Sequence, residues 1–65
     1  MKNTRLKLAR VEKDLSQDEL AHLIGVSRQT IGLIEQGKYN LSLSLCIAIC
    51  RELSKTLDDL FWEEV

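Results

Sequence analysis

The chain has few of the residues that build covalent, metal-bound or catalytic sites. It contains no proline, two cysteines and one histidine among its 65 residues. Two cysteines cannot make a disulfide framework, and their spacing fits no zinc-site pattern. The sequence also shows neither a glycine-rich phosphate loop nor a cleft-forming pair of carboxylates. An enzyme is therefore the function class that the sequence favours least, and we predict no catalytic residue, no metal site and no cofactor.

Long apolar stretches are absent as well. No apolar run reaches the length that spans a bilayer. The first ten residues, MKNTRLKLAR, lack the apolar segment found in secretory signals. We therefore expect a soluble, cytoplasmic protein with no membrane partner. The sequence gives no indication of a small-molecule ligand.

The residues that are present are typical of one small helical domain. Hydrophobic residues make up 45% of the sequence and aromatic residues only 5%, which favours a compact all-α fold over disorder. A single domain over residues 1–65 buries only about 60% of the surface that its unfolded chain exposes. Because no disulfide or metal supplements this core, self-association is the remaining means of stabilisation.

The two parts of the chain differ in charge. The net charge is −1, which taken alone argues against a nucleic-acid ligand. Residues 1–40 carry seven basic and five acidic side chains, a charge of +2, whereas residues 41–65 carry two basic and five acidic ones, a charge of −3. This distribution is compatible with one weakly basic face that approaches phosphates.

The segment from residue 16 to residue 37 predicts two short helices joined by a tight turn. Ser16 and Glu19 have the spacing of a capping box, which starts a helix at residue 17. Gly25 interrupts the apolar pattern where a positive φ costs glycine least. Ser27 can cap a second helix. This arrangement is typical of a helix-turn-helix.

The second of these helices has an apolar and a polar face. Ile31 and Ile34 are expected to point inward, and Gly37 follows as a left-handed stop. The outward face carries side chains that can bond to base edges and phosphates, and the gap at its glycine can admit the wall of a DNA groove. These residues are Arg28, Gln29, Thr30 and Gly32.

Capping signals and apolar spacing predict three further helices. They cover residues 4–13, a range from Ser42 or Ser44 to about residue 53, and residues 56–60. In the first, Leu6, Ala9 and Arg10 share one side, and Leu8 and Val11 are expected to contact a later helix. Asp14 suits a left-handed turn, and Leu15 is expected to enter the core. The ends, Met1–Thr4 and Phe61–Val65, either pair as a short β-ribbon or fray.

The long apolar helix near residue 47 is expected to be covered on more than one side, because apolar residues surround it. Cys46 and Cys50 lie four residues apart on it, a spacing that suits a disulfide poorly. We interpret them as small reduced core residues. His22 is expected to face solvent.

With these residues in view, the chain resembles the Xre/Cro-repressor family of helix-turn-helix proteins, whose domain is the five-helix lambda-repressor-like fold. The resemblance rests on LSQDELAHLIGVSRQTIGLIEQGKYN (residues 15–40) and, less strongly, on SLSLCIAICRELSKTLDDLF (residues 42–61). It implies double-stranded DNA as partner. It also implies an ion pair between Arg10 and Glu35 that holds the recognition helix at its angle.

The resemblance assigns DNA contacts to particular positions. Gln17 would lie against a phosphate and brace the start of the recognition helix, unless it is simply solvated. Gln29 would read a base, Arg28 a base or a phosphate, and Thr30 a phosphate or a thymine methyl group. Leu33 would contact thymine methyl groups or be partly buried against the next helix. The full set of expected DNA contacts is Gln17, Ser27, Arg28, Gln29, Thr30, Gly32, Leu33, Lys38, Tyr39 and Asn40.

Three of the expected DNA contacts form a loop. Two residues outside that set, Leu41 and Ser54, depart from the family pattern. The loop Lys38–Asn40 would contact the DNA backbone, although Tyr39 could instead cover the core. Leu41 stands where a proline is usual, which loosens the loop. Ser54 stands where a glycine often ends the helix, so a left-handed conformation there would be mildly strained.

The resemblance also implies a homodimer that pairs through its C-terminal helices. The expected interface residues are Leu57, Leu60, Phe61 and Trp62. We therefore interpret the chain as a transcriptional regulator, in the simplest case a repressor on a pseudo-palindromic operator. The alternative is an antitoxin, or another interaction module, that autoregulates its own operon. Because an antitoxin needs an extra segment to cover its toxin and none follows Val65, we favour the regulator.

Overall fold

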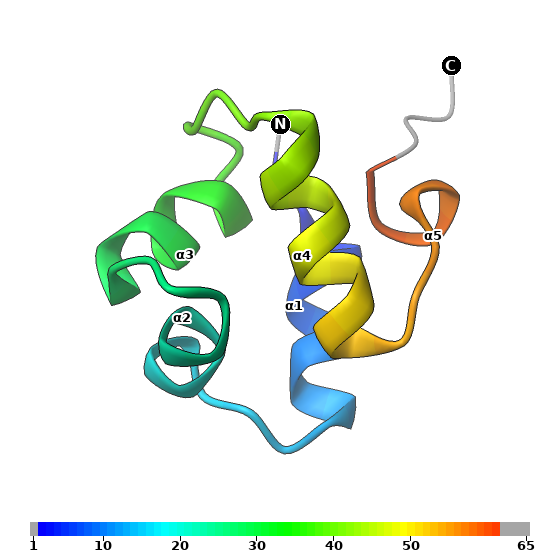
Figure 1. The fold of residues 1–65 in the computed structure, drawn as a ribbon, viewed down its shortest axis with the longest axis horizontal. Coiled ribbons are helices and arrows are strands. Elements are labelled where there is room, and N and C mark those ends of the chain that lie inside the picture. The colour runs from blue at the N-terminus through cyan, green and yellow to red at the C-terminus, as the bar shows by residue number, and fades with distance from the viewer. Residues whose placement is uncertain (1, 62–65) are drawn as a thin grey trace.

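The computed structural model describes residues 2–61, and every regular element in that range is an α-helix. The helices are α1 (Thr4–Glu12), α2 (Gln17–Ile24), α3 (Arg28–Glu35), α4 (Leu43–Leu53) and α5 (Leu57–Phe61). The predicted all-α class and the five helices are confirmed, and the predicted bounds differ by no more than one residue. In Figure 1, α2 and α3 lie on one side of α4, and α5 lies on the other side.

Each helix begins at a polar side chain that accepts a hydrogen bond from a backbone N–H in the first turn. The caps of α1 to α4 are Asn3, Ser16, Ser27 and Ser42, and Thr56 plays the same part before α5. The predicted capping box of α2 is complete, because Glu19 accepts from the Ser16 N–H and donates its own N–H to Ser16 Oγ, both at 3.0 Å. The local sequence therefore fixes where the helices start.

A residue in the left-handed conformation follows the end of each helix from α1 to α4. Gly25 and Gly37 have φ values of +78° and +74°, as expected for glycine stops. Asp14 and Ser54 adopt the same region with φ values of +56° and +55°. Both were expected there, and Ser54 closes α4 with the strain that a residue with a Cβ experiences in this conformation.

The core lies where α1, α2, α3 and α4 meet, and α5 closes it from the side of α1 and α4. Its buried apolar side chains are Leu6, Ala9, Leu20, Ala21, Ile31, Ile34, Ile49, Cys50, Leu53 and Leu60. Leu15 is half-buried against this cluster, so the expectation that it enters the core is confirmed.

One expectation about apolar surface was wrong and another was confirmed. Leu8 and Val11 are 58% and 53% exposed, so they are not covered by a later helix. The helix α4 is covered on more than one side, as expected, because α2 and α5 both pack against it, although Leu43 and Ile47 are 66% and 36% exposed. A chain of this length can bury one stripe of each helix, and no further described element covers the outer faces.

The two ends of the described chain are joined by hydrogen bonds. Asn3 Nδ2 donates to the Leu60 carbonyl oxygen at 2.9 Å, and the Asn3 backbone N–H donates to the Glu35 carbonyl oxygen at 2.8 Å. Thr4 and Phe61 are helical, so the β-ribbon cannot include them. The caps Asn3 and Thr56 start helices at these places instead. The other residues of that expectation, Met1 and residues 62–65, lie outside the described residues.

No helix within residues 2–61 is long and apolar enough to cross a membrane.

Candidate nucleic-acid interface

The turn between α2 and α3 is fixed by backbone hydrogen bonds. After the left-handed Gly25, the Val26 N–H donates to the Ala21 carbonyl oxygen at 2.9 Å. Val26 is half-buried against the core. The chain then reaches Ser27, whose hydroxyl accepts from the Thr30 N–H at 3.1 Å. These contacts hold α3 at a defined angle to α2.

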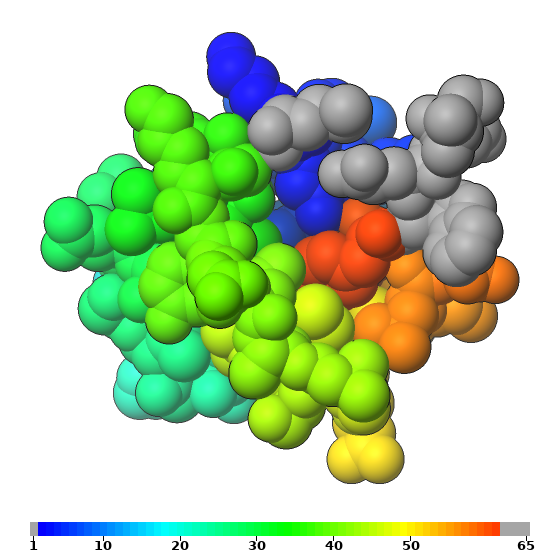
Figure 2. All heavy atoms as spheres, turned by 90° about the horizontal axis from the view of Figure 1, so that it is seen from above, coloured from blue at the N-terminus to red at the C-terminus, as the bar shows by residue number. Residues whose placement is uncertain are grey.

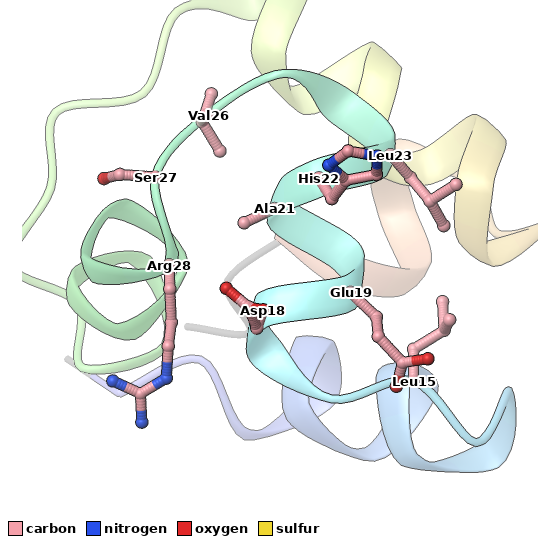
Figure 3. Close-up of a pocket in the computed structure, with 9 residues that line it drawn as sticks. All are labelled: Leu15, Asp18, Glu19, Ala21, His22, Leu23, Val26, Ser27 and Arg28. Atoms are coloured by element: carbon pink, nitrogen blue, oxygen red, sulfur yellow. The ribbon is translucent and has the colours of Figure 1, made fainter.

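The helix α3 has the two faces that its sequence predicts. Ile31 and Ile34 are 0% and 2% exposed and pack into the core. Arg28 and Gln29, in the first turn, are exposed. Figure 3 shows the Arg28 side chain reaching away from α2, with its guanidinium at the far end. An exposed first turn on a buried base is the part of a helix that can enter the major groove.

Three further expected DNA contacts on α3 are less exposed. Thr30, Gly32 and Leu33 are half-buried and lie beside the exposed first turn. The Thr30 hydroxyl also forms a hydrogen bond with that of Ser27, with 2.9 Å between the two oxygens. Both hydroxyls therefore help to cap α3. Each hydroxyl oxygen has a second lone pair, which can accept another hydrogen bond.

The last residue of α3, Glu35, forms an ion pair buried between helices. Arg10 Nε lies 2.8 Å from Glu35 Oε2, and Arg10 Nη2 donates to Glu35 Oε1 at 3.3 Å. The remaining guanidinium nitrogen, Nη1, donates to the Leu15 carbonyl oxygen at 2.7 Å. The expected pair between α1 and the end of α3 is therefore confirmed, and its partners are only 10% and 7% exposed. Planar contacts of this kind fix orientation as well as distance.

Gln17 braces α3 at a different place from the one expected. Its Nε2 donates to Glu35 Oε1 at 3.0 Å, so it supports the end of α3 and not its start. The alternative of a simply solvated glutamine is wrong, because Gln17 is half-buried. As the first residue of α2, Gln17 has a backbone N–H that lacks a partner within the helix, which leaves it available to a phosphate.

The loop after α3 is exposed and starts from a fixed point. The Lys38 N–H donates to the Leu33 carbonyl oxygen at 2.9 Å, directly after Gly37. Lys38, Tyr39 and Asn40 are all exposed. Tyr39 is 41% exposed, so the alternative that it covers the core is wrong. Leu41 then packs against the core and anchors the far end of the loop.

A hollow of about 530 Å³ lies along the outer side of α2 (Figure 3). Its apolar lining comes from Leu15, Ala21, Leu23 and Val26, and polar side chains surround these. His22 is exposed on this helix, as expected. Hydrogen bonds from the Ser16 backbone and hydroxyl hold the pKa of the Glu19 carboxyl below its usual value. The hollow lies beside the expected DNA contacts, and only Ser27 and Arg28 belong to both.

The cysteines behave as reduced core residues. Both are free, with Cys50 buried and Cys46 half-buried. Burial raises the pKa of both thiols. Protonated thiols are poor ligands and poor nucleophiles, and residues 2–61 contain no group of three metal-ligating side chains.

The expected dimer residues differ in exposure. Leu57 is 39% exposed and Phe61 is half-buried. Leu60 is only 3% exposed, so it belongs to the core of one protomer and offers no free surface to a second. Trp62 lies outside the described residues. Sequence reasoning missed Leu43 and Ile47 as exposed apolar residues, although their spacing of four indicates that they share a side of α4.

The capped helix, the left-handed turn and the second capped helix with its polar first turn define a helix-turn-helix DNA-binding protein. Residues 6–60 match the Helix-turn-helix family HTH_3. The chain therefore belongs to this family, and the Xre-type resemblance noted in the sequence is confirmed.

Curated relatives and solved structures agree with this assignment. The uncharacterized HTH-type transcriptional regulator YgzD of Bacillus subtilis is 42% identical over 64 residues, which cover 98% of this chain and 96% of the relative. MJ0272 of Methanocaldococcus jannaschii, another HTH-type transcriptional regulator, is 46% identical over 61 residues, covering 94% and 91%. The restriction-modification controller protein C.AhdI of Aeromonas hydrophila superposes with a TM-score of 0.82 at 36% identity, covering 91% of this chain and 86% of its own. The protein is a DNA-binding transcriptional regulator and not an enzyme.

Proposed function

We propose that the protein is a repressor that binds a pseudo-palindromic operator as a homodimer, in which the α3 helix of each protomer lies in a major groove. The observation that carries this proposal is the contrast between the two faces of α3. Its first turn is exposed and polar at Arg28 and Gln29, while its end is fixed by the buried pair of Arg10 and Glu35. A reading helix needs both, because base contacts discriminate only when their geometry is fixed.

Each exposed residue has a role that suits its chemistry. Gln29 reads an adenine through two hydrogen bonds, and Arg28 contacts a guanine or a phosphate. Leu33 contacts thymine methyl groups. The loop Lys38–Asn40 and the start of α2 at Gln17 position the protein on the DNA backbone. The charge of +2 in residues 1–40 supports this placement.

The opposite end of the molecule supports a dimer. Figure 2 shows α3 and its loop on one side and α5 on the other, as Figure 1 does. Leu43 and Ile47 on α4 and Leu57 on α5 are exposed apolar side chains that a second protomer can bury. Pairing through these side chains leaves each α3 free. Two recognition helices about 34 Å apart then contact successive major grooves on one side of the duplex.

In the simplest mechanism, the protein represses transcription by occupying its operator. A dimer that covers two half-sites overlapping a promoter excludes other proteins from that DNA. Because phosphate contacts release counterions, operator affinity should fall with salt by a slope of about −0.9 for each phosphate neutralised.

Binding-site selection from random DNA, followed by fluorescence anisotropy on the enriched sequence, tests the proposal. We expect an inverted repeat to be enriched and Gln29→Ala to lower its affinity at least about tenfold and to relax the preference at one base pair per half-site. Glu52→Ala, an exposed change on α4, is the control and should bind as the wild type does. Enrichment of no sequence by the folded protein contradicts the proposal.

The dimer is tested separately by sedimentation. Trp62→Ala should lower the dimer fraction, because large aromatic side chains contribute most to interfaces of this size. An unchanged dimer would place the interface elsewhere.

A further inference from the structure

Gly32 occupies a position where glycine weakens the protein. It lies in the interior of α3, between Arg28 and Glu35, and its backbone is helical. The other two glycines, Gly25 and Gly37, have positive φ values that other residues adopt with strain, whereas Gly32 does not. In a helix interior, glycine is less stable than alanine, because its backbone loses more conformational freedom on folding.

The protomer itself gives no steric reason for this glycine. A methyl group added at Gly32 would lie 3.9 Å from Gln17 Oε1, an ordinary van der Waals contact. Apart from its chain neighbours and its own helical backbone, no other atom of the described chain would lie within 4 Å of that methyl group. The missing side chain therefore leaves a notch in the surface of α3, and no contact of the described residues requires glycine there.

The notch lies within the face that is expected to meet DNA. Arg28 and Gln29 are its neighbours on the helix, four and three residues before it. Its floor is the Cα and backbone of Gly32. One wall is Oε1 of Gln17, which faces this side because Nε2 of the same amide donates to Glu35.

The atoms that line the notch determine which chemical group can bind in it. A carbonyl oxygen repels the oxygens of a phosphate, so the notch is a poor phosphate site. Its floor is the Cα of Gly32, and the Gly32 carbonyl oxygen already accepts from the Gln36 N–H at 3.1 Å, so the floor favours an apolar group. In the major groove the exposed apolar group is the C5-methyl group of thymine.

We infer that Gly32 is a specificity-determining residue whose notch receives a thymine methyl group. This inference rests on the proposed DNA-reading role of α3 and adds to it the base feature that is read without a side chain. A residue with a Cβ would hold α3 away from that methyl group and weaken the neighbouring contacts of Gln29 as well. The glycine thus lowers the stability of the helix but allows its backbone to approach DNA closely.

The first experiment separates stability from binding. Gly32→Ala and Gly32→Val are compared with the wild type and with Glu52→Ala in urea unfolding and in operator binding. Gly32→Ala should unfold at equal or higher urea concentration and bind the selected operator about tenfold more weakly. Gly32→Val should bind more weakly still. Equal affinity of the wild type and Gly32→Ala would overturn the inference, whichever way stability changes.

The second experiment removes the methyl group from the DNA. Each thymine of the operator is replaced by deoxyuridine, which differs only by that group. For the wild type, one replacement per half-site should raise the dissociation constant about threefold to fivefold, as expected for one buried methyl group. For Gly32→Ala the same replacement should change it little, because the methyl group no longer fits.

The outcomes distinguish the inference from the proposed function. If the wild type selects no DNA sequence, both fail. If it selects an operator but no deoxyuridine replacement weakens binding, the inference alone fails. The same holds if the sensitive thymine remains equally sensitive in Gly32→Ala.

Discussion

The two halves of this protein leave different kinds of surface uncovered. The segment from α2 to the loop after α3 exposes mainly polar residues such as Arg28, Gln29 and Lys38, together with Leu23 and Tyr39. The helices α4 and α5 instead expose apolar residues, Leu43, Ile47 and Leu57 among them. Both halves have the same design of capped helices on a shared core, so the difference lies in their outer faces.

This difference teaches what each half is fitted to contact. A nucleic-acid partner is recognised by polar side chains held on a rigid base, and the buried Arg10–Glu35 pair provides that base. A protein partner is recognised by apolar area, which costs free energy while it remains in water. Under the proposed function, one small core therefore supports both a DNA-reading face and an association face.

The largest effect is expected from Glu35→Ala. The change leaves the Arg10 guanidinium buried without its carboxylate partner and also removes the acceptor of Gln17. We expect a loss of about 3–5 kcal/mol of unfolding free energy, measured by urea unfolding followed by circular dichroism. Glu12→Ala is the matched control.

That control removes the exposed pair with Lys55, whose atoms are 3.5 Å apart. It should lower the unfolding free energy by less than about 1 kcal/mol. Similar losses for the two variants would mean that the buried pair does not stabilise the base of α3.

The next largest effect should appear in the second half. Ile47→Lys places a charge on the exposed apolar surface of α4, and we expect it to raise the dimer dissociation constant about thirtyfold, which corresponds to about 2 kcal/mol. Analytical ultracentrifugation measures the change. Val11→Lys, an equally conspicuous exposed apolar residue on α1, should leave the dimer intact. Loss of the dimer in Val11→Lys alone would move the interface to α1.

A smaller effect is expected from Ser16→Ala. The change removes the hydroxyl that accepts from the Glu19 N–H at 3.0 Å and should lower the unfolding free energy by about 1 kcal/mol. Ser44→Ala, which changes an exposed serine on α4 that is not the cap, serves as control in the same urea assay. An equal loss in both variants would argue against a special role of the cap.

Ser54→Gly should stabilise the protein slightly. Ser54 has a φ of +55° at the end of α4, a conformation that glycine adopts without strain. Because glycine also gains freedom in the unfolded chain, we expect a net gain of only about 0.5 kcal/mol. Differential scanning calorimetry should show a higher Tm, and a lower one would show that Ser54 is not strained.

The smallest effect concerns pH and should be shared by the two halves. Hydrogen bonds from Ser16 lower the pKa of Glu19, and those from Thr56 lower the pKa of Asp59. Because both folded pKa values lie below the unfolded ones, this stability is present above the unfolded pKa values and is lost as pH falls through the folded ones. As pH falls into this range, the unfolding free energy of the wild type, measured in urea, should decrease more than that of Glu19→Gln. Parallel curves would contradict this assignment.

Local signals in the sequence predicted most of the fold. Ser16 with Glu19, and Thr56 with the acid three residues later, mark helix starts through bonds that span three residues. Gly25 and Asp14 mark turns through their own backbone preferences. Such features need no distant partner, so they can be predicted from the sequence.

Expectations that depended on distant partners were less reliable. Leu8 was expected to be covered and is exposed, and Gln17 was expected to brace the start of α3 but bonds to its end. Apolar spacing shows which residues share a face. It does not show whether another element reaches that face or which atom a long side chain will meet.

The sequence by itself determined the five helices, their caps and the polar first turn of α3, because helix starts and stops are set by neighbouring residues. Only the tertiary structure decided that Gln17 also bonds to Glu35 and that Leu43 and Ile47 remain uncovered. These features arise where separate helices meet or fail to meet. That outcome depends on how one small core is shared among all five helices.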